Sequence, residues 1–221
     1  MIVVNFKTYK EATGYKAIDL ARIIRRVMDE TRVRIVAVPQ VADLRDCVEA
    51  GAECWVQHVD PVSPGKNTGW IGVEDVEEAG AHGTILNHSE HKLPWEVLVK
   101  TMEVIAGRAF EGCVCANSVE EAVKIDSLKP DFIAYEPPEL IGSRDKSVAS
   151  EKPDIIAAVV KAVTKPVLIG AGVHSVEDVK VGLQLGAKGI LLATDVVLAQ
   201  DPERELRKLA DVFHSFASPK E

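Results

Sequence analysis

Aromatic residues and cysteines are scarce in this sequence of 221 residues. Phe, Trp and Tyr together make up 5% of the chain, and there are only four cysteines. Four cysteines in a chain of this length do not form the disulfide framework of a small secreted protein, so we expect reduced thiols and a cytoplasmic location. The hydrophobic content of 47% excludes an intrinsically disordered chain, because it provides enough apolar surface for a core.

Long apolar segments and an excess of positive charge are also missing. Residues 1–5 contain no basic region and no long apolar run, so we expect neither a signal peptide nor a membrane span. The 34 acidic residues exceed the 26 basic residues, which gives a net charge of −8. Proteins that bind nucleic acids or membrane surfaces present a basic face, so the sequence argues against both partners. An anionic substrate is still compatible with this charge, because it needs only a local positive site.

Short apolar runs alternate with longer amphipathic segments along the whole chain. Most of the runs are continuous, as in parallel strands that are buried on both faces. The amphipathic segments have helical spacing, and Ser118, Asp154 and Ser175 stand where helices begin. The predicted strands are residues 2–6, 34–39, 53–59, 83–87, 112–116, 131–135, 166–170 and 188–193. The predicted helices are residues 15–29, 42–50, 95–106, 118–125, 153–163 and 203–213.

Eight strand–helix units without a flexible linker predict a single α/β domain over residues 1–221. We expect a parallel (β/α)8 barrel, with an open doubly wound sheet as the alternative. The helices must be shortened, because barrels of this kind usually have about 250 residues. Residues 60–72 contain two prolines and three glycines and show no helix or strand pattern. A long connection of this kind is typically functional or part of an interface, although a plain surface excursion is the alternative.

Polar residues follow several predicted strands at their carboxyl ends, where the active sites of such barrels lie. Asn5 and Lys7 follow the first strand, His88 and Glu90 the fourth, and Glu136 the sixth. A lysine with backbone N–H groups suits a phosphate monoester, and a carboxylate with a histidine suits proton transfer beside a carbonyl. The sequence therefore predicts an enzyme that acts on a small phosphorylated metabolite.

Three segments of the sequence resemble the triosephosphate isomerase family in their order and spacing. They are residues 5–7 (NFK), 87–90 (NHSE) and 134–142 (AYEPPELIG). The last segment and the short helices resemble the compact archaeal-type branch of that family. The resemblance covers essentially the whole chain. It implies a TIM barrel that interconverts dihydroxyacetone phosphate and D-glyceraldehyde 3-phosphate through an enediolate, with no cofactor and no metal ion.

The resemblance also implies a role for each polar residue at the strand ends. Glu136 is expected to be the catalytic base and His88 the neutral electrophile, a pairing known from this family. We expect a helix to begin just after His88, since a helix N-terminus disfavours the imidazolium. Lys7 is expected to hold the charge of the substrate and Asn5 to orient it. Glu90 is expected to be a structural partner of Lys7 or of nearby backbone rather than a second base.

The remaining predicted substrate contacts lie in loops. Residues 137–147 are expected to form a lid that closes over the site and excludes water. Backbone N–H groups after the seventh and eighth strands are expected to bind the phosphate. The predicted substrate-binding residues in these loops are Ile141 and Gly142 in the lid, Gly172 after the seventh strand, and Ala193 and Thr194 after the eighth.

Asp195 and Trp70 depart from the family pattern. Asp195 places a carboxylate near the expected phosphate, so we expect its side chain to turn away and substrate binding to be moderately weakened.

Trp70 on an exposed loop is natural at an interface and costly in a monomer. In the family this loop inserts into a neighbouring subunit, with the residue that matches Thr68 reaching the partner's site. We therefore expect a homo-oligomer, with a tetramer as the first expectation and a dimer as the alternative.

Other interpretations of the sequence stay open at this point. A phosphoribosyl-type isomerase or synthase would use the same barrel and the glycine-rich turns but not the three family segments. A non-catalytic protein that binds a phosphorylated metabolite would account for Asp195. His88 and His91 have the spacing of a metal-binding pair, but no third ligand cluster stands out. Cys113 and Cys115 are interpreted as packed thiols rather than redox groups.

Overall fold

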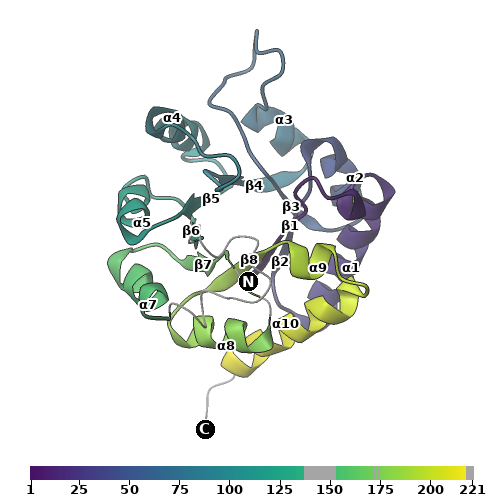
Figure 1. Ribbon diagram of the computed structural model, residues 1–221. Coiled ribbons are helices and arrows are strands. Elements are labelled where there is room, and N and C mark those ends of the chain that lie inside the picture. Colours follow the sequence, from purple (N-terminus) through teal and green to yellow (C-terminus); the bar gives the residue numbers. More distant parts are fainter. Residues whose placement is uncertain (137–152, 172, 174, 218–221) are drawn as a thin grey trace.

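Eight parallel strands form one closed barrel in the order β1 to β8 (Figure 1). The computed structural model describes residues 1–136, 153–171, 173 and 175–217. The barrel closes because Ile2 of β1 pairs with Ile35 of β2 on one side and with Ile190 of β8 on the other. The strands are β1 (Ile2–Asn5), β2 (Ile35–Val38), β3 (Glu53–Val56), β4 (Ala81–Leu86), β5 (Glu111–Ala116), β6 (Phe132–Tyr135), β7 (Val167–Ile169) and β8 (Gly189–Leu192). The predicted (β/α)8 barrel is confirmed, and the open sheet is excluded.

Helices connect the strands and surround the barrel (Figure 1). They are α1 (Tyr15–Thr31), α2 (Leu44–Glu49), α3 (Val73–Glu78), α4 (Trp95–Ile105), α5 (Val119–Asp126), α7 (Pro153–Ala162), α8 (Val176–Gln184), α9 (Thr194–Val197) and α10 (Pro202–Ala217). The 3-10 turns η1 (Lys10–Ala12) and η2 (Val41–Asp43) precede α1 and α2. Both α2 and α3 have only six residues, which confirms that the helices are shortened.

Capping side chains begin α5 and α8 at the residues that the sequence indicates. Ser118 accepts a hydrogen bond from the backbone N–H of Glu121 at the start of α5. Ser175 forms a reciprocal capping box with Asp178 at the start of α8. Asp154 lies in the first turn of α7, where a negative charge is stabilised by the helix dipole.

The apolar core has two layers, because each strand is buried on both faces. Val3 points into the barrel, whereas Ile2 and Val4 of the same strand pack against the helices. Trp55 fills the barrel interior and is fully buried. A Cβ atom on Gly83 would lie 2.8 Å from the Trp55 ring, so this position has no room for a larger residue.

Ion pairs close the barrel at the amino ends of its strands. Arg34 lies over the Trp55 ring and pairs with Glu53 and Glu111, which begin β3 and β5. Because this end is closed by structural contacts, the carboxyl ends of the strands are left for a functional site.

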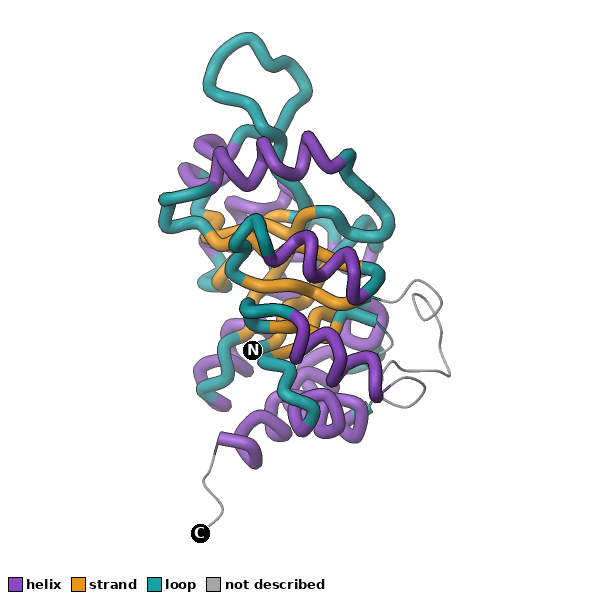
Figure 2. Tube along the Cα trace, turned by 90° about the vertical axis from the view of Figure 1, so that its left-hand side faces the viewer, coloured by secondary structure: helices purple, strands orange, loops and turns teal. Residues whose placement is uncertain are grey.

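The segment 60–72 projects from the barrel next to α3 (Figures 1 and 2). Asp60 closes its base, because the Asp60 N–H donates to the Ile71 carbonyl and the Asp60 carboxylate accepts the Ile71 N–H at 2.7 Å. The side chain of Trp70 is 55% exposed on this loop. Within the described residues, none of the helices has the length and apolar character needed to cross a membrane.

Candidate active site

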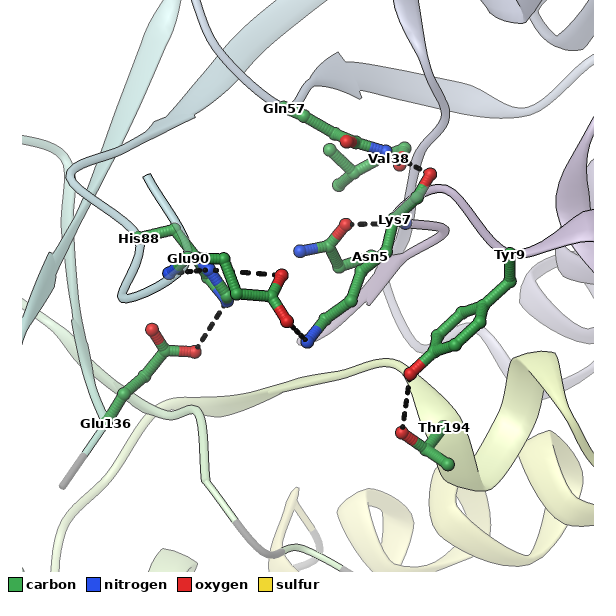
Figure 3. A network of polar contacts seen from close by, with 9 residues as sticks. All are labelled: Asn5, Lys7, Tyr9, Val38, Gln57, His88, Glu90, Glu136 and Thr194. Carbon is green, nitrogen blue, oxygen red and sulfur yellow. Dashed lines mark hydrogen bonds and ion pairs between the residues drawn. The ribbon is translucent and has the colours of Figure 1, made fainter. Parts of the chain in front are cut away.

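The carboxyl ends of β4 and β6 bring His88 and Glu136 into contact (Figure 3). The imidazole Nε2 of His88 lies 3.3 Å from Oε1 of Glu136. Both side chains are buried, and only 2% of Glu136 is exposed. Two polar side chains that follow different strands therefore meet inside the mouth of the barrel, as expected for residues at the carboxyl ends of its strands.

A backbone hydrogen bond determines which nitrogen of His88 carries the proton. The N–H of Glu90 donates to Nδ1 of His88 at 3.2 Å, so Nδ1 must offer a lone pair. A neutral imidazole with an unprotonated Nδ1 carries its proton on Nε2, the nitrogen that faces Glu136. The site thus presents a neutral N–H donor rather than an imidazolium.

The helix expected directly after His88 is not formed, so that prediction is wrong. Residues 88–91 make a single turn, closed by the His91 N–H and the His88 carbonyl at 2.8 Å. The N–H of Leu93 is hydrogen-bonded to the Asn87 side chain, and Pro94 disfavours a helical conformation of the residue before it. The next helix, α4, therefore begins only at Trp95. The neutral form of His88 follows from the Glu90 N–H and not from a helix dipole.

One carboxylate oxygen of Glu136 is buried without a hydrogen-bond partner. This atom is Oε2, and it has no partner among the residues that the structure describes. Buried polar groups are normally paired, so an unpaired carboxylate oxygen marks a position that a ligand or its proton can occupy. Burial, together with the nearby Glu136 carboxylate, raises the pKa of the Cys115 thiol well above its usual value. Cys115 is therefore a neutral thiol beside Glu136.

The backbone of Lys7 is held in a left-handed conformation, with a φ of 47°, that non-glycine residues rarely adopt. Asn5 accepts the Lys7 N–H at 2.9 Å, and Gln57 donates to the Lys7 carbonyl at 2.9 Å (Figure 3). Gln57 also donates to the Val38 carbonyl at 3.3 Å and so ties the loop to β2. The ammonium group of Lys7 pairs with Glu90 at 2.8 Å, the structural contact that the sequence indicates for Glu90.

Gln57 is a residue of the site that the sequence does not indicate. The sequence places it inside a predicted strand, residues 53–59, whereas β3 ends at Val56. A strand that ends at Val56 would have made Gln57 the first polar residue after a carboxyl end. Gln57 is therefore missed because the predicted strand extends too far, and not because of its residue type.

The predicted phosphate-binding residues are described only in part. Ala193 precedes the first turn of α9, and its carbonyl accepts the N–H groups of Val196 and Val197. The hydroxyl of Thr194 lies 3.4 Å from that of Tyr9, a contact that joins the loops after β1 and β8. The other predicted contacts, Ile141, Gly142 and Gly172, lie outside the described residues.

A cavity of about 370 Å³ opens beside Lys7 and His88. Its lining includes side chains from the ends of β1, β3 and β4. Those that belong to the polar network are Asn5, Lys7, Gln57, His88 and Glu90. Among the described residues, no group of three or more His, Cys, Asp or Glu side chains is arranged to hold a metal ion.

The barrel, the neutral imidazole and the buried carboxylate define an enzyme of the aldose–ketose isomerase class, which moves a proton beside the carbonyl of a small sugar phosphate. The sequence profile of one family, described as Triosephosphate isomerase, matches residues 1–212. The chain belongs to the triosephosphate isomerase family. Its reaction is the interconversion of dihydroxyacetone phosphate and D-glyceraldehyde 3-phosphate, and the phosphoribosyl-type and non-catalytic interpretations do not apply.

Several archaeal proteins named triosephosphate isomerase are similar to this chain over nearly their full length. The protein from Methanothermus fervidus is 41% identical over 215 residues, which are 95% of this chain and 96% of that protein. The protein from Methanocaldococcus jannaschii is 37% identical over 95% of this chain and 98% of its own length. The protein from Thermoplasma volcanium is 39% identical over 94% and 98% of the two chains. The expected resemblance to the archaeal-type branch agrees with these relatives.

Proposed function

We propose that Glu136 and His88 carry out the proton transfer of this isomerisation. Glu136 removes a proton from the carbon next to the carbonyl group, and the electrons of that C–H bond form the double bond of the enediolate. The negative charge develops on the carbonyl oxygen, where Nε2–H of His88 donates a hydrogen bond. A proton then passes from the hydroxyl oxygen of the neighbouring carbon to this oxygen, the C=O double bond forms on that neighbouring carbon, and Glu136 returns its proton to the former carbonyl carbon. The observation that carries this proposal is the Nε2–H donor of His88, fixed by the Glu90 N–H, beside the buried carboxylate.

Lys7 supplies the positive charge that holds the substrate. Its ammonium group lies at the cavity and is paired with Glu90, and its backbone is fixed on both sides by Asn5 and Gln57. Because the whole chain is negative, binding of an anionic substrate depends on this local charge and on backbone N–H groups.

The phosphate contacts and the lid belong to the same proposal. We infer that the backbone of Gly172, Ala193 and Thr194 binds the phosphate, because loops after the last two strands of such barrels commonly do so. Ile141 and Gly142 would close over the bound substrate and exclude water from the enediolate.

The Glu136→Gln variant tests the proposed base. The variant keeps the size of the side chain and removes its ability to accept a proton. We expect kcat to fall by about 10²- to 10⁴-fold with a small change in KM, as measured by following dihydroxyacetone phosphate formed from glyceraldehyde 3-phosphate. The matched control is Glu120→Gln, an exposed carboxylate on α5. Full activity of Glu136→Gln would show that another group is the base.

The reaction as proposed needs no cofactor and no metal ion, since both proton transfer and charge stabilisation come from side chains. Prolonged dialysis against a chelator should therefore leave kcat unchanged. Activity that disappears on dialysis and returns with an added metal ion would contradict this part of the proposal.

We propose that the protein is a homo-oligomer, with a tetramer expected and a dimer as the alternative. The exposed Trp70 and Thr68 on the projecting loop support an interface, because a large exposed aromatic side chain is costly in water. Light scattering at micromolar concentration should give two or four times the chain mass of 24.0 kDa. Trp70→Ser should lower this mass, whereas Phe216→Ser, exposed on α10, should not. A particle of single-chain mass for the wild type would overturn the proposal.

We also propose a cytoplasmic protein built as a single domain over residues 1–221, with no nucleic-acid or membrane partner. The four cysteines support a reducing compartment, because all are buried and unpaired, and burial raises the pKa of Cys47 to about 12. Cell fractionation would test the location, and one cooperative unfolding transition would test the single domain.

A further inference from the structure

Asn87 stands at the point where β4 ends and the chain turns toward His88. Its φ is 57°, a left-handed conformation that asparagine tolerates better than most residues other than glycine. The last backbone pair of the ladder between β4 and β5 is Leu86 with Val114. One residue later, the side-chain amide of Asn87 donates to the carbonyl of Cys115 at 2.9 Å. The side chain therefore extends the strand pairing by one step after the backbone has turned away.

The same side chain also fixes the far end of the His88 turn. Oδ1 of Asn87 accepts the N–H of Leu93 at 3.1 Å. Residues 88–92 thus form a short loop whose two ends are joined by one buried asparagine, which is only 4% exposed. His88 is the first residue of this loop, and the N–H that holds its Nδ1 comes from Glu90 inside it.

Glu121 of α5 anchors this loop from the outside. Its Oε1 accepts hydrogen bonds from the Asn87 amide at 3.0 Å and from the Lys92 ammonium at 2.7 Å. Its Oε2 accepts the N–H of Asn117 at 2.7 Å, in the loop that follows β5. One carboxylate therefore joins the loop after β4 to the loop after β5.

We propose that Asn87 and Glu121 are positioning residues for His88, and that they set where its Nε2–H points relative to Glu136. The inference rests on the proposed role of His88. Neither side chain needs to touch the substrate, because both act through the loop that carries the imidazole. Loss of either residue should therefore lower kcat. A displaced His88 stabilises the enediolate less well, whereas binding of the substrate is affected less.

Two truncations test the network. Asn87→Gly retains a residue that adopts the left-handed conformation but removes all three side-chain hydrogen bonds. Glu121→Ala removes the outer anchor and leaves Asn87 in place. A groove of about 290 Å³ reaches both residues, so water can solvate the groups left without a partner and the variants should fold. Circular dichroism and thermal unfolding check that they do.

We expect Asn87→Gly to lower kcat by about 10- to 100-fold while KM changes by less than about threefold, because small displacements of a catalytic group are costly. Glu121→Ala should act in the same direction with a smaller loss. The double variant should be no worse than Asn87→Gly alone, since both substitutions break one network. The control is Glu120→Ala, an exposed neighbour on the same helix, which should retain wild-type kcat.

A spectroscopic readout separates positioning from a general structural effect. In the wild type, the 15N shifts of His88 should show one tautomer with an unprotonated Nδ1. In Asn87→Gly, the two tautomers should exchange, because the Glu90 N–H is no longer held in place.

The His88→Gln variant makes the possible failures distinguishable. If His88→Gln is inactive while Asn87→Gly and Glu121→Ala keep kcat within about twofold of the wild type, the positioning inference fails and the proposed function stands. A rise in KM with unchanged kcat in the two truncations would also overturn the inference. If His88→Gln retains full activity, the proposed role of His88 itself fails.

Discussion

Gly170 provides the space that the carboxylate of Glu136 occupies. A Cβ atom at Gly170 would lie 2.5 Å from Cγ and 2.9 Å from Oε1 of Glu136. The position is fixed by the barrel, because the Gly170 N–H donates to the Tyr135 carbonyl at 2.9 Å just after β7. The φ of Gly170 lies outside the left-handed region, so glycine is required here for space and not for conformation.

Gly170→Ala should therefore displace the proposed base. We expect kcat to fall by about 100-fold with a small change in KM, because the carboxylate must move to accommodate the methyl group. Overpacking should also lower the free energy of unfolding by about 1–3 kcal/mol. The isomerisation assay and chemical denaturation measure the two effects.

The control for this substitution is the same change in a Glu136→Ala background. Alanine at position 136 has no Cγ, so the added methyl group would meet no side chain there. The destabilisation caused by Gly170→Ala should then largely disappear. An equal destabilisation in both backgrounds would show that the clash involves other atoms.

Gln57 should control substrate binding through Lys7. Gln57→Leu removes the hydrogen bonds to the Lys7 and Val38 carbonyls, whereas the hydrogen bond from the Lys7 N–H to Asn5 remains. Losing the hydrogen bond that supports the Lys7 carbonyl costs about 1 kcal/mol of binding free energy, so we expect KM to rise by about fivefold with little change in kcat. Steady-state kinetics measure this, with Gln200→Leu, an exposed glutamine, as the control. A change in kcat alone would contradict the assignment.

Much of the barrel follows from sequence because its strands are buried on both faces. The runs around Val3, Val36 and Leu168 are continuously apolar, and each forms a strand in the structure. The positions of Lys7 and His88 at the site follow from the rule that active-site residues lie at the carboxyl ends of parallel strands. The helices α3 and α9, for which the sequence indicates neither a start nor a range, have only six and four residues and so show little helical periodicity.

The parts of the site that sequence did not predict depend on contacts between distant residues. The turn after His88 replaces the expected helix because Asn87 bonds Cys115 and Leu93. The space beside Glu136 depends on which residue follows β7 opposite it, which is a matter of strand register. Neither hydrogen-bond partners nor register can be obtained from the periodicity of one segment.

Glu121 should make part of the folding stability of the protein depend on pH, with stability lost in acid. Burial raises the pKa of its carboxyl, but hydrogen bonds from Lys92, the Asn117 N–H and Asn87 outweigh burial, and the net result is a lowered pKa. A carboxyl with a lower pKa in the folded state binds fewer protons than in the unfolded state. Its stabilising contribution is therefore complete above the ordinary value of about 4.3 and is lost as the pH falls through the folded-state pKa.

The variant Glu121→Gln tests this linkage. It should be less stable than the wild type at pH 7, and the difference in free energy of unfolding should shrink as the pH falls below about 4. Urea denaturation between pH 3 and pH 7 measures the difference. The control is Asp211→Asn, an exposed carboxylate in the middle of α10, which should keep the pH dependence of the wild type. A difference for Glu121→Gln that does not vary with pH would refute the linkage.

Asp195 should weaken binding of the substrate phosphate. It lies half-buried in the first turn of α9, directly after the proposed phosphate contacts Ala193 and Thr194. Two unit charges about 4 Å apart repel by about 1 kcal/mol in water, so removing the carboxylate should lower KM by about threefold to tenfold. We expect this for both Asp195→Asn and Asp195→Gly, with kcat little changed. The asparagine variant keeps the side-chain size, whereas the glycine variant also removes a favourable charge at a helix start.

The dependence on salt separates charge repulsion from a change of loop shape. Repulsion between Asp195 and the phosphate is screened by salt, so the KM values of wild type and Asp195→Asn should converge as ionic strength rises toward about 1 M. Asp211→Asn on α10 makes the same change in net charge away from the predicted phosphate loops and should leave KM unaltered. If Asp195→Asn and Asp195→Gly leave KM unchanged or raise it, the carboxylate does not oppose the substrate. Its position at the start of α9 would then favour a stabilising role for this loop.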